Sequence, residues 1–164
     1  MENNSISSTA TQLEENKPVE IEIKKEGPVK GESIRINNIK PTLLIMCDSA
    51  IIDRDTSKIS LIGIFEGFKS KSKPAIYPQF TIFTRFENGD GKHSHNVKIR
   101  QNNSKNIIAE LKGEINFSIK GNAQHVGSFI GLPFPDFGKY TIEVYLDDND
   151  DICIDREFEV INES

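Results

Sequence analysis

Cysteine is scarce in this sequence of 164 residues, which contains only Cys47 and Cys153. Two cysteines are too few for a disulfide framework, and their wide separation does not fit the spacing of metal ligands. The N-terminus has no cationic start followed by an apolar run, so it does not resemble a secretory leader. We therefore expect a cytoplasmic protein in which both thiols are reduced and buried as small apolar side chains.

Long apolar runs are also missing. No stretch reaches the ~18 consecutive apolar residues of a membrane-spanning helix, and we expect no membrane association. The formal net charge is −5 and the isoelectric point is about 5.3. Nucleic acids and anionic membranes attract basic surfaces, so this charge disfavours both and favours a protein partner.

Motifs that would indicate catalysis are absent too. The sequence has no G-x-S-x-G motif, no catalytic cysteine motif and no glycine-rich loop that could hold phosphates. Cys47 lies inside an apolar run, where a thiolate would be disfavoured. The sequence therefore favours a protein that is not an enzyme, and it predicts no catalytic residue and no cofactor.

The length and composition of the chain fit one folded domain with some unstructured chain attached. Hydrophobic residues make up 36% of the sequence and charged residues 27%. Met1–Glu15 is rich in Ser, Thr, Asn and Glu and offers little to bury. We predict a flexible N-terminal extension over residues 1–40 and a β-sandwich domain over residues 41–164. Within the extension, Val19–Ile23 alternates as a strand would, either free or docked on a sheet edge.

Two apolar runs open the predicted domain, Thr42–Ile52 and Ile59–Phe68, with a short polar turn between them. This pattern predicts a β-hairpin. Because both runs are apolar at nearly every position, we expect strands that are covered on both faces. Gly63 and Gly67 interrupt the second run and indicate a bulge or a close approach of backbones.

The rest of the domain continues with short alternating segments separated by turns. Glu87–Gly91 contains Asn-Gly and Asp-Gly in tandem, which is a strong hairpin pattern. Further alternation runs through Tyr140–Leu146 and Ile152–Val160, and no helical period is convincing. We predict an all-β fold, an immunoglobulin-like antiparallel β-sandwich of about eight or nine strands, with a barrel as the alternative.

Tyr140 follows the turn residue Gly138 and opens an alternating strand. This is the place of a tyrosine corner, in which the hydroxyl bonds to backbone upstream. A tyrosine that simply fills the core is the other interpretation, and the sequence leaves both open.

The histidines are the first candidates for a metal site. His93 and His95 stand two residues apart on a predicted strand, so both imidazoles face the same side and could chelate zinc. His125 is the only remaining histidine that could add a third ligand. The same face carries Val97 and Ile99, and we therefore expect a half-buried strand end instead of a metal site.

A second candidate is the acidic segment between the last two predicted strands. Asp147, Asn149 and Asp151 have the D-x-N-x-D spacing of a calcium loop. Ile152 and Phe158 stand where an EF-hand would need Gly and Glu. We therefore interpret this segment as a solvated hairpin tip.

Asp48 and Arg156 are charged residues in apolar surroundings, because Asp48 interrupts the first apolar run and Arg156 falls on the inward face of the last strand. A buried charge needs a partner. We expect structural roles for both residues, and a direct Asp48–Arg156 pair would satisfy the two together.

Cys47–Phe68 resembles a segment of a family of small, uncharacterised bacterial proteins. The resemblance rests on a Cys-Asp pair, a turn, and the run Lys-x-Ser-Leu-Ile-Gly-Ile-Phe. Tyr77-Pro78, Gly91–His93 and Gly138–Tyr140 also look like that family, so the resemblance spans most of Pro41–Val160. It implies a small bacterial β-sandwich of unknown function, and it carries over no catalytic residue.

The function expected from the sequence is that of a non-enzymatic binding module for a protein partner whose identity, like the oligomeric state, the sequence leaves open. One alternative is a small metal-dependent hydrolase around His93, His95 and Asp48, which would require the histidines to converge. Another is a structural subunit that assembles through a sheet edge, with Val19–Ile23 as a candidate strand.

Overall fold

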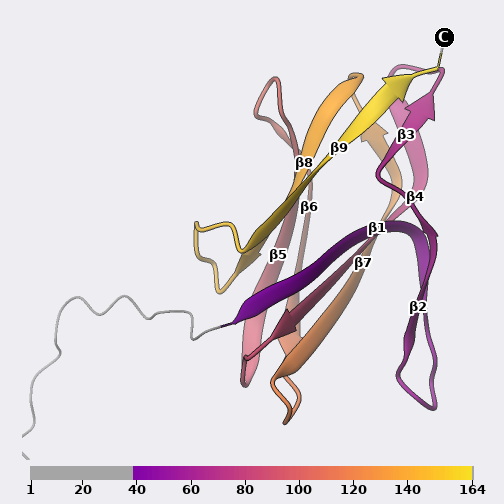
Figure 1. Cartoon of the computed structure of the whole chain (residues 1–164). Coiled ribbons are helices and arrows are strands. Elements are labelled where there is room, and N and C mark those ends of the chain that lie inside the picture. Colours follow the sequence, from indigo (N-terminus) through magenta and orange to yellow (C-terminus); the bar gives the residue numbers. More distant parts are fainter. Residues whose placement is uncertain (1–38, 164) are drawn as a thin grey trace, which may run out of the picture. The chain divides into compact units, whose positions relative to one another are not determined.

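The computed structural model describes residues 39–163, and these residues form nine β-strands (Figure 1). The strands are β1 (Lys40–Ile52), β2 (Ile59–Ile64), β3 (Gly67–Ser70), β4 (Ala75–Glu87), β5 (Lys92–Gln101), β6 (Ile107–Asn116), β7 (Asn122–Phe134), β8 (Gly138–Leu146) and β9 (Ile154–Asn162). Residues 39–163 contain no helix with the length and apolarity that a membrane span requires. Most of the predicted extension over residues 1–40, including Val19–Ile23, lies outside the described residues.

The strands form two sheets, which confirms the all-β prediction. One sheet has four strands in the order β2-β1-β4-β7, and the other has five in the order β3-β9-β8-β5-β6. Neighbouring strands are antiparallel except β3 and β9, which are parallel. The chain changes sheet before and after β3, between β4 and β5, between β6 and β7, and between β7 and β8, so that each sheet combines distant parts of the sequence.

The hydrophobic core lies between the inner faces of the two sheets. Alternation along each strand sends every second side chain inward, as the sequence pattern predicted. Both sheets contribute large side chains that are almost completely buried, among them Met46, Phe80, Phe86, Phe134, Tyr140, Ile142 and Phe158.

The predicted hairpin is confirmed as β1 and β2, but the expectation that both strands are covered on both faces is wrong. β2 lies at the edge of its sheet and pairs only with β1 among the described residues. Ile62 and Ile64 remain 47% and 59% exposed. Apolar residues on both sides of a strand therefore did not mean burial here, because no layer of described residues covers the outer face of this sheet.

Gly63 explains the interruption in the second apolar run. Its φ of +67° lies in the left-handed region, which favours glycine. A Cβ at this position would also collide with the carboxylate of Asp48 on the neighbouring strand. The glycine thus permits the close approach of backbone and side chain that the sequence indicated.

Tyr140 is both a core residue and a tyrosine corner. The side chain is completely buried, and its ring lies 5.7 Å from that of Phe158 in a stacked arrangement. The hydroxyl donates a hydrogen bond to the carbonyl of Asp136 at 2.7 Å and accepts one from the amide of the same residue at 3.2 Å. The bonds fix the turn before β8 against the strand that follows it.

The predicted Asp48–Arg156 pair is wrong. Arg156 donates to the carbonyl oxygen of Leu44 at 3.1 Å and forms an ion pair with Glu66 at 3.0 Å. Asp48 instead accepts a hydrogen bond from the hydroxyl of Tyr77 at 2.7 Å. Asp48 is exposed, so the expectation of a buried charge at this position is wrong as well. Sequence patterns do not determine the register between two packed sheets.

Replacing Tyr140 by Phe tests the tyrosine corner. The variant keeps the ring and loses both hydrogen bonds, which leaves the carbonyl and amide of Asp136 without this partner. We expect the free energy of unfolding to fall by about 1–2 kcal/mol. Urea unfolding measures the change, and an unaltered m-value would show that the fold is kept. An unchanged midpoint would contradict a stabilising role for the hydroxyl.

Candidate functional site

Two of the three histidines meet inside the sandwich. The ring centroids of His95 on β5 and His125 on β7 lie 4.3 Å apart, and His95 is buried. Nε2 of His95 shares a hydrogen bond with the hydroxyl of Thr84 at 3.2 Å. The Nδ1 atoms of both rings are buried without a hydrogen-bond partner among the described residues. The two rings therefore meet as a close pair in the interior.

Burial sets the protonation of this pair. It lowers the pKa of His95 to about 3, with a further contribution from the charge that His125 would carry. Burial also lowers the pKa of His125. Both imidazoles are consequently neutral at physiological pH.

His93 does not join the other two histidines. Its Nδ1 lies 2.6 Å from Oδ2 of Asp147, its Nε2 lies 2.8 Å from the carbonyl oxygen of Asp90, and its ring packs edge-on against Phe117. Burial is the largest single influence and would lower the pKa of His93, but the hydrogen bonds to Asp147 and to the carbonyl of Asp90, with the charges of both aspartates, together outweigh it and raise the pKa. Nowhere in residues 39–163 do three His, Cys, Asp or Glu side chains come together in a group that could hold a metal ion.

The acidic hairpin tip uses its oxygens within the protein. Asp147 contacts His93 and also accepts a hydrogen bond from the amide of Ser94 at 3.2 Å. Asn149 accepts from the amide of Asp151 at 3.2 Å. The D-x-N-x-D spacing therefore corresponds to local turn bonds and an ion pair with β5.

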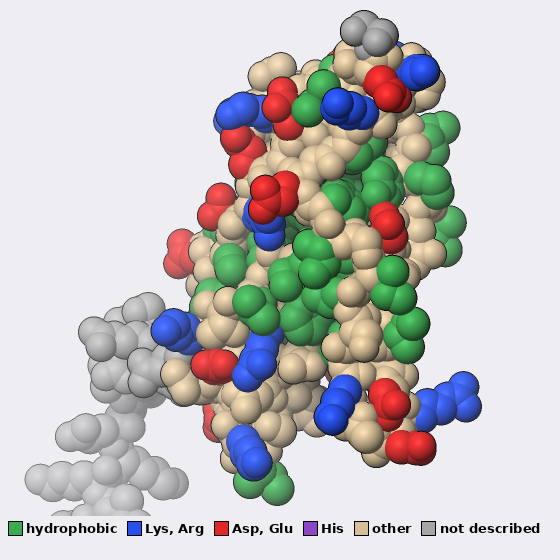
Figure 2. All heavy atoms as spheres, turned by 45° about the vertical axis from the view of Figure 1, so that its right-hand side comes forward, with side chains coloured by type: hydrophobic (Ala, Val, Ile, Leu, Met, Phe, Trp, Pro, Cys, Tyr) green, Lys and Arg blue, Asp and Glu red, His purple; other side chains and the backbone are tan. Residues whose placement is uncertain are grey.

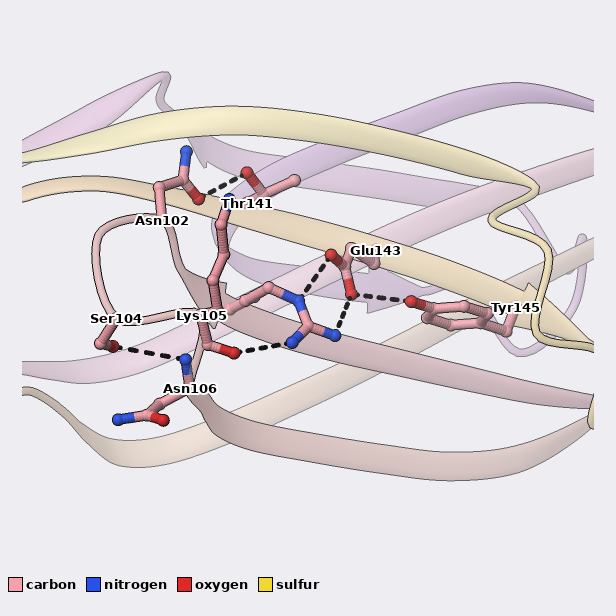
Figure 3. Close-up of polar contacts among 8 residues, drawn as sticks. Asn102, Ser104, Lys105, Asn106, Thr141, Glu143 and Tyr145 are labelled. Carbon is pink, nitrogen blue, oxygen red and sulfur yellow. Dashed lines mark hydrogen bonds and ion pairs between the residues drawn. The ribbon is translucent and has the colours of Figure 1, made fainter.

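The outer face of the five-stranded sheet carries a buried ion pair at its centre (Figure 3). Arg100 on β5 binds both carboxylate oxygens of Glu143 on β8, at 2.8 and 3.0 Å, and donates to the carbonyl of Lys105 at 2.7 Å. Tyr145 donates its hydroxyl to Glu143 at 2.8 Å. Burial would raise the pKa of Glu143, but the bonds from Arg100 and Tyr145 hold it below its ordinary value.

Further polar contacts join the remaining strands of this face. Lys139 and Glu157 form an ion pair at 2.6 Å, and Asn102 bridges Thr141 at 2.8 Å and Glu157 at 3.0 Å. The side chains on this face thus bind one another across the strands. The result is a charged surface whose side chains are joined by ion pairs and hydrogen bonds.

The outer face of the four-stranded sheet is different in kind. Residues directly opposite each other in an antiparallel pair point to the same side of the sheet, so the strand register shows which side chains share this outer face. Phe83 lies between Ile45 and Val126, Cys47 lies opposite Ile64, and Ser49 lies opposite Ile62. We call this surface the isoleucine face, and its apolar residues are Leu43, Ile45, Cys47, Ile62, Ile64, Phe83, Val126 and Ile130.

Exposure varies across the isoleucine face. Phe83 and Cys47 at its centre are buried by their neighbours, whereas Ile130 on β7 is 86% exposed. Among the described residues, charged side chains lie near one end of the isoleucine face, where Arg85 forms an ion pair with Glu87 at 3.1 Å. Figure 2 brings the side with β2 forward and shows hydrophobic side chains gathered in its middle, with most charged side chains above and below them.

The sequence contained the residues of this face but not its exposure. The two apolar runs of the first hairpin suggested strands covered on both sides. A relevant pattern was present in Ile59–Ile64, which has no charged residue although edge strands commonly carry one.

Replacing His95 by Gln tests the buried pair through its pH dependence. An unfolded imidazole titrates near 6.5, so the unfolded chain binds more protons than the folded one below that pH. We expect the wild-type free energy of unfolding to fall between about pH 6.5 and 3, by up to about 1.4 kcal/mol per pH unit for His95. The Gln variant should show a flatter dependence in urea unfolding.

His93 provides the matched control, because its raised pKa acts in the opposite sense. The stabilisation from protonated His93 is complete below about pH 6.5 and is lost as the pH rises through its raised pKa. His93→Gln should therefore keep the wild-type slope between about pH 6.5 and 3 and change the profile only above about pH 6.5. Equal slopes in the wild type and the His95→Gln variant would refute the buried neutral pair.

Comparison with known proteins identifies a family for the domain but no activity. No curated protein matches the chain. The model of a family of unknown function (DUF6941) matches residues 42–153, which is more than half of the 164 residues. The matched segment begins within β1 and ends between β8 and β9. The chain belongs to this family of unknown function.

Proposed function

We propose that this protein is a non-enzymatic interaction module that binds a protein partner through the isoleucine face. The observation that carries the proposal is the contrast between the two outer sheet faces. One face is charged, and many of its side chains bind one another, as the Arg100–Glu143–Tyr145 contacts illustrate. The other exposes Ile62 and Ile64 on β2 and Ile130 on β7.

Energetics supports a partner on this surface. Removing exposed apolar surface from water lowers the free energy by roughly 25 cal/mol per Å². Ile130, Ile64 and Ile62 keep between 47% and 86% of their surface accessible, so each retains area that a partner could cover. Apolar patches on a folded domain commonly mark interaction sites, and the centres of protein interfaces are depleted in charge.

The chemistry of the face also constrains the partner. Its apolar centre calls for an apolar complement, and the Arg85–Glu87 pair at its margin suits a polar rim. The net charge of −5 disfavours nucleic acid or an anionic membrane as the ligand. A protein surface with an apolar centre meets these conditions best.

We infer that the scaffold is immunoglobulin-like. Adjacent strands β1, β4 and β7 in one sheet, and β9, β8 and β5 in the other, correspond to strands A, B, E and G, F, C of that fold. Tyr140 stands at the start of β8, the counterpart of strand F, where a tyrosine corner occurs. The fold alone does not assign a function, so the proposal rests on the exposed face.

The cellular setting is part of the same proposal. Cys47 and Cys153 are both free thiols, which is consistent with a reducing compartment. Together with the resemblance of Cys47–Phe68 to bacterial proteins, this supports a bacterial cytoplasm.

Replacing Ile130 by Glu tests the proposed surface. The side chain is already 86% exposed, so a charge there should leave stability nearly unchanged while it disrupts an apolar contact. We expect the partner's dissociation constant to rise about tenfold or more. The full-length protein would capture the partner from extracts of its native cell, and titration calorimetry with the purified partner would measure the affinity.

Lys112→Gln on the opposite outer face is the matched control, because it also lowers the net charge by one at an exposed position. It should bind like the wild type. A partner that binds all three proteins with equal affinity would place the interaction elsewhere and contradict the proposal.

A further inference from the structure

Both nitrogens of the His93 imidazole face hydrogen-bond acceptors. Nδ1 lies 2.6 Å from Oδ2 of Asp147, and Nε2 lies 2.8 Å from the backbone carbonyl oxygen of Asp90. A carbonyl oxygen can only accept a hydrogen bond, and the same holds for an ionised carboxylate. A neutral imidazole has one N–H and satisfies one of the two acceptors, whereas the imidazolium has two and satisfies both. This geometry therefore requires the protonated ring.

The two acceptors belong to separate segments of the chain. Asp90 lies in the turn between β4 and β5, and Asp147 begins the loop between β8 and β9. Burial is the largest single influence on the ring and opposes its charge. The bonds and charges of the two aspartates together outweigh burial, so the pKa of His93 is raised. One protonated side chain thus joins two loops at the same end of the sandwich.

The neighbouring strand β6 brings no titratable group to the ring. His93 lies opposite Ile115 on β6, and its ring packs edge-on against Phe117. Lys92 and Glu114 lie one position away along the two strands and point to the other face, where they form an ion pair with each other at 3.9 Å. The carboxylates on the side of the ring are therefore those of the two aspartates.

The two loops are held with unequal strength. Besides its contact with His93, Asp147 accepts a hydrogen bond from the amide of Ser94 at 3.2 Å and donates its own amide to the Ser94 carbonyl at 3.1 Å. The turn between β4 and β5 is held through the Gly89 amide, which bonds to the Gly121 carbonyl at 3.2 Å, and through the Gly91 carbonyl. No other side chain of the described residues bonds to the Asp90 carbonyl.

Loss of one proton would affect the two contacts differently. A hydrogen bond to a charged acceptor is roughly twice as strong as one between neutral groups, so the remaining N–H stays with Asp147. Nε2 of His93 then presents a lone pair to the Asp90 carbonyl oxygen. Two acceptors at 2.8 Å repel each other, and the carbonyl must turn away from the ring.

We propose that His93 is a proton-dependent clamp, which holds the β4–β5 turn while both ring nitrogens carry hydrogen and releases Asp90 when one proton leaves. The turn keeps its bonds from the Gly89 amide and to the Gly91 carbonyl, so the release is local and the sandwich stays folded. The clamp is closed at lower pH and opens as the pH rises above about 6.5, the ordinary midpoint of histidine. It does not depend on whether a partner binds the isoleucine face.

A pH titration of the full-length protein by NMR tests the clamp. The Gly91 amide shares a peptide group with the Asp90 carbonyl, so its resonance reports the bond from His93. We expect His93 to titrate with a midpoint above about pH 6.5 and the Gly91 amide to follow the same midpoint. Above it, the protection factor of the Gly89 amide against hydrogen exchange should fall about tenfold. The Ser94 amide, which stays bonded to Asp147, should change much less.

A matched pair of variants separates a specific contact from the general acidity of the loop. Asp147→Asn keeps an oxygen acceptor but removes the charge, so the midpoints of His93 and of the Gly91 amide should both fall. Asp148→Asn changes the net charge equally at the adjacent position, which is also exposed and has a positive φ. It should leave both midpoints nearly unchanged. His93→Gln should abolish the response of the Gly91 amide in this pH range.

Several outcomes would overturn the proposal. They are a His93 midpoint at or below about pH 6.5, a Gly91 amide that does not follow it, a Gly89 protection factor that stays constant, and equal shifts in the two loop variants. Burial lowers the pKa of both His95 and His125, so their titrations fall below that of His93. Thermal unfolding at pH 6 would verify that each variant is folded, and the wild-type titration stands without the variants.

Discussion

The packing of four aromatic rings between the sheets is the interaction on which the rest of this structure depends. Phe80 and Phe134 come from the four-stranded sheet, and Tyr140 and Phe158 come from the five-stranded sheet. The centroids of neighbouring rings lie 5.2–5.8 Å apart. Some of these ring pairs lie within one sheet, and others join the two sheets. Because strands from both halves of the chain supply these rings, neither sheet could bury its inner face without the other.

The core occupies the inner faces of both sheets, so only the outer faces are open to the surroundings. The five-stranded sheet presents charged groups that bind one another, with Arg100 and Glu143 at their centre. The four-stranded sheet presents isoleucines and ends at the unprotected strand β2. An apolar face, made by side chains, and an open edge, made by backbone groups, are thus both features of the four-stranded sheet.

Several elements followed from local sequence. Alternating apolar residues predicted most of the strands, and Asp53–Ser57 predicted the first turn because their side chains bond nearby amides, as Asp53 and Thr56 do. The place of Tyr140 after Gly138 indicated the corner. Contacts between sheets did not follow, because they depend on how the sheets slide and twist against each other. The contact of Arg156 with Leu44 belongs to this class, and so does the His95–His125 contact.

The sequence by itself determined the all-β class, the first hairpin and the need of Arg156 and Tyr140 for polar partners. These are local consequences of side-chain period, turn chemistry and the cost of burying a polar group. Only the tertiary structure decided which partners they have, which outer face is apolar and which strand lies at an edge. Exposure depends on neighbours from distant parts of the chain, and a strand that is apolar on both sides has the same sequence whether or not another layer covers it.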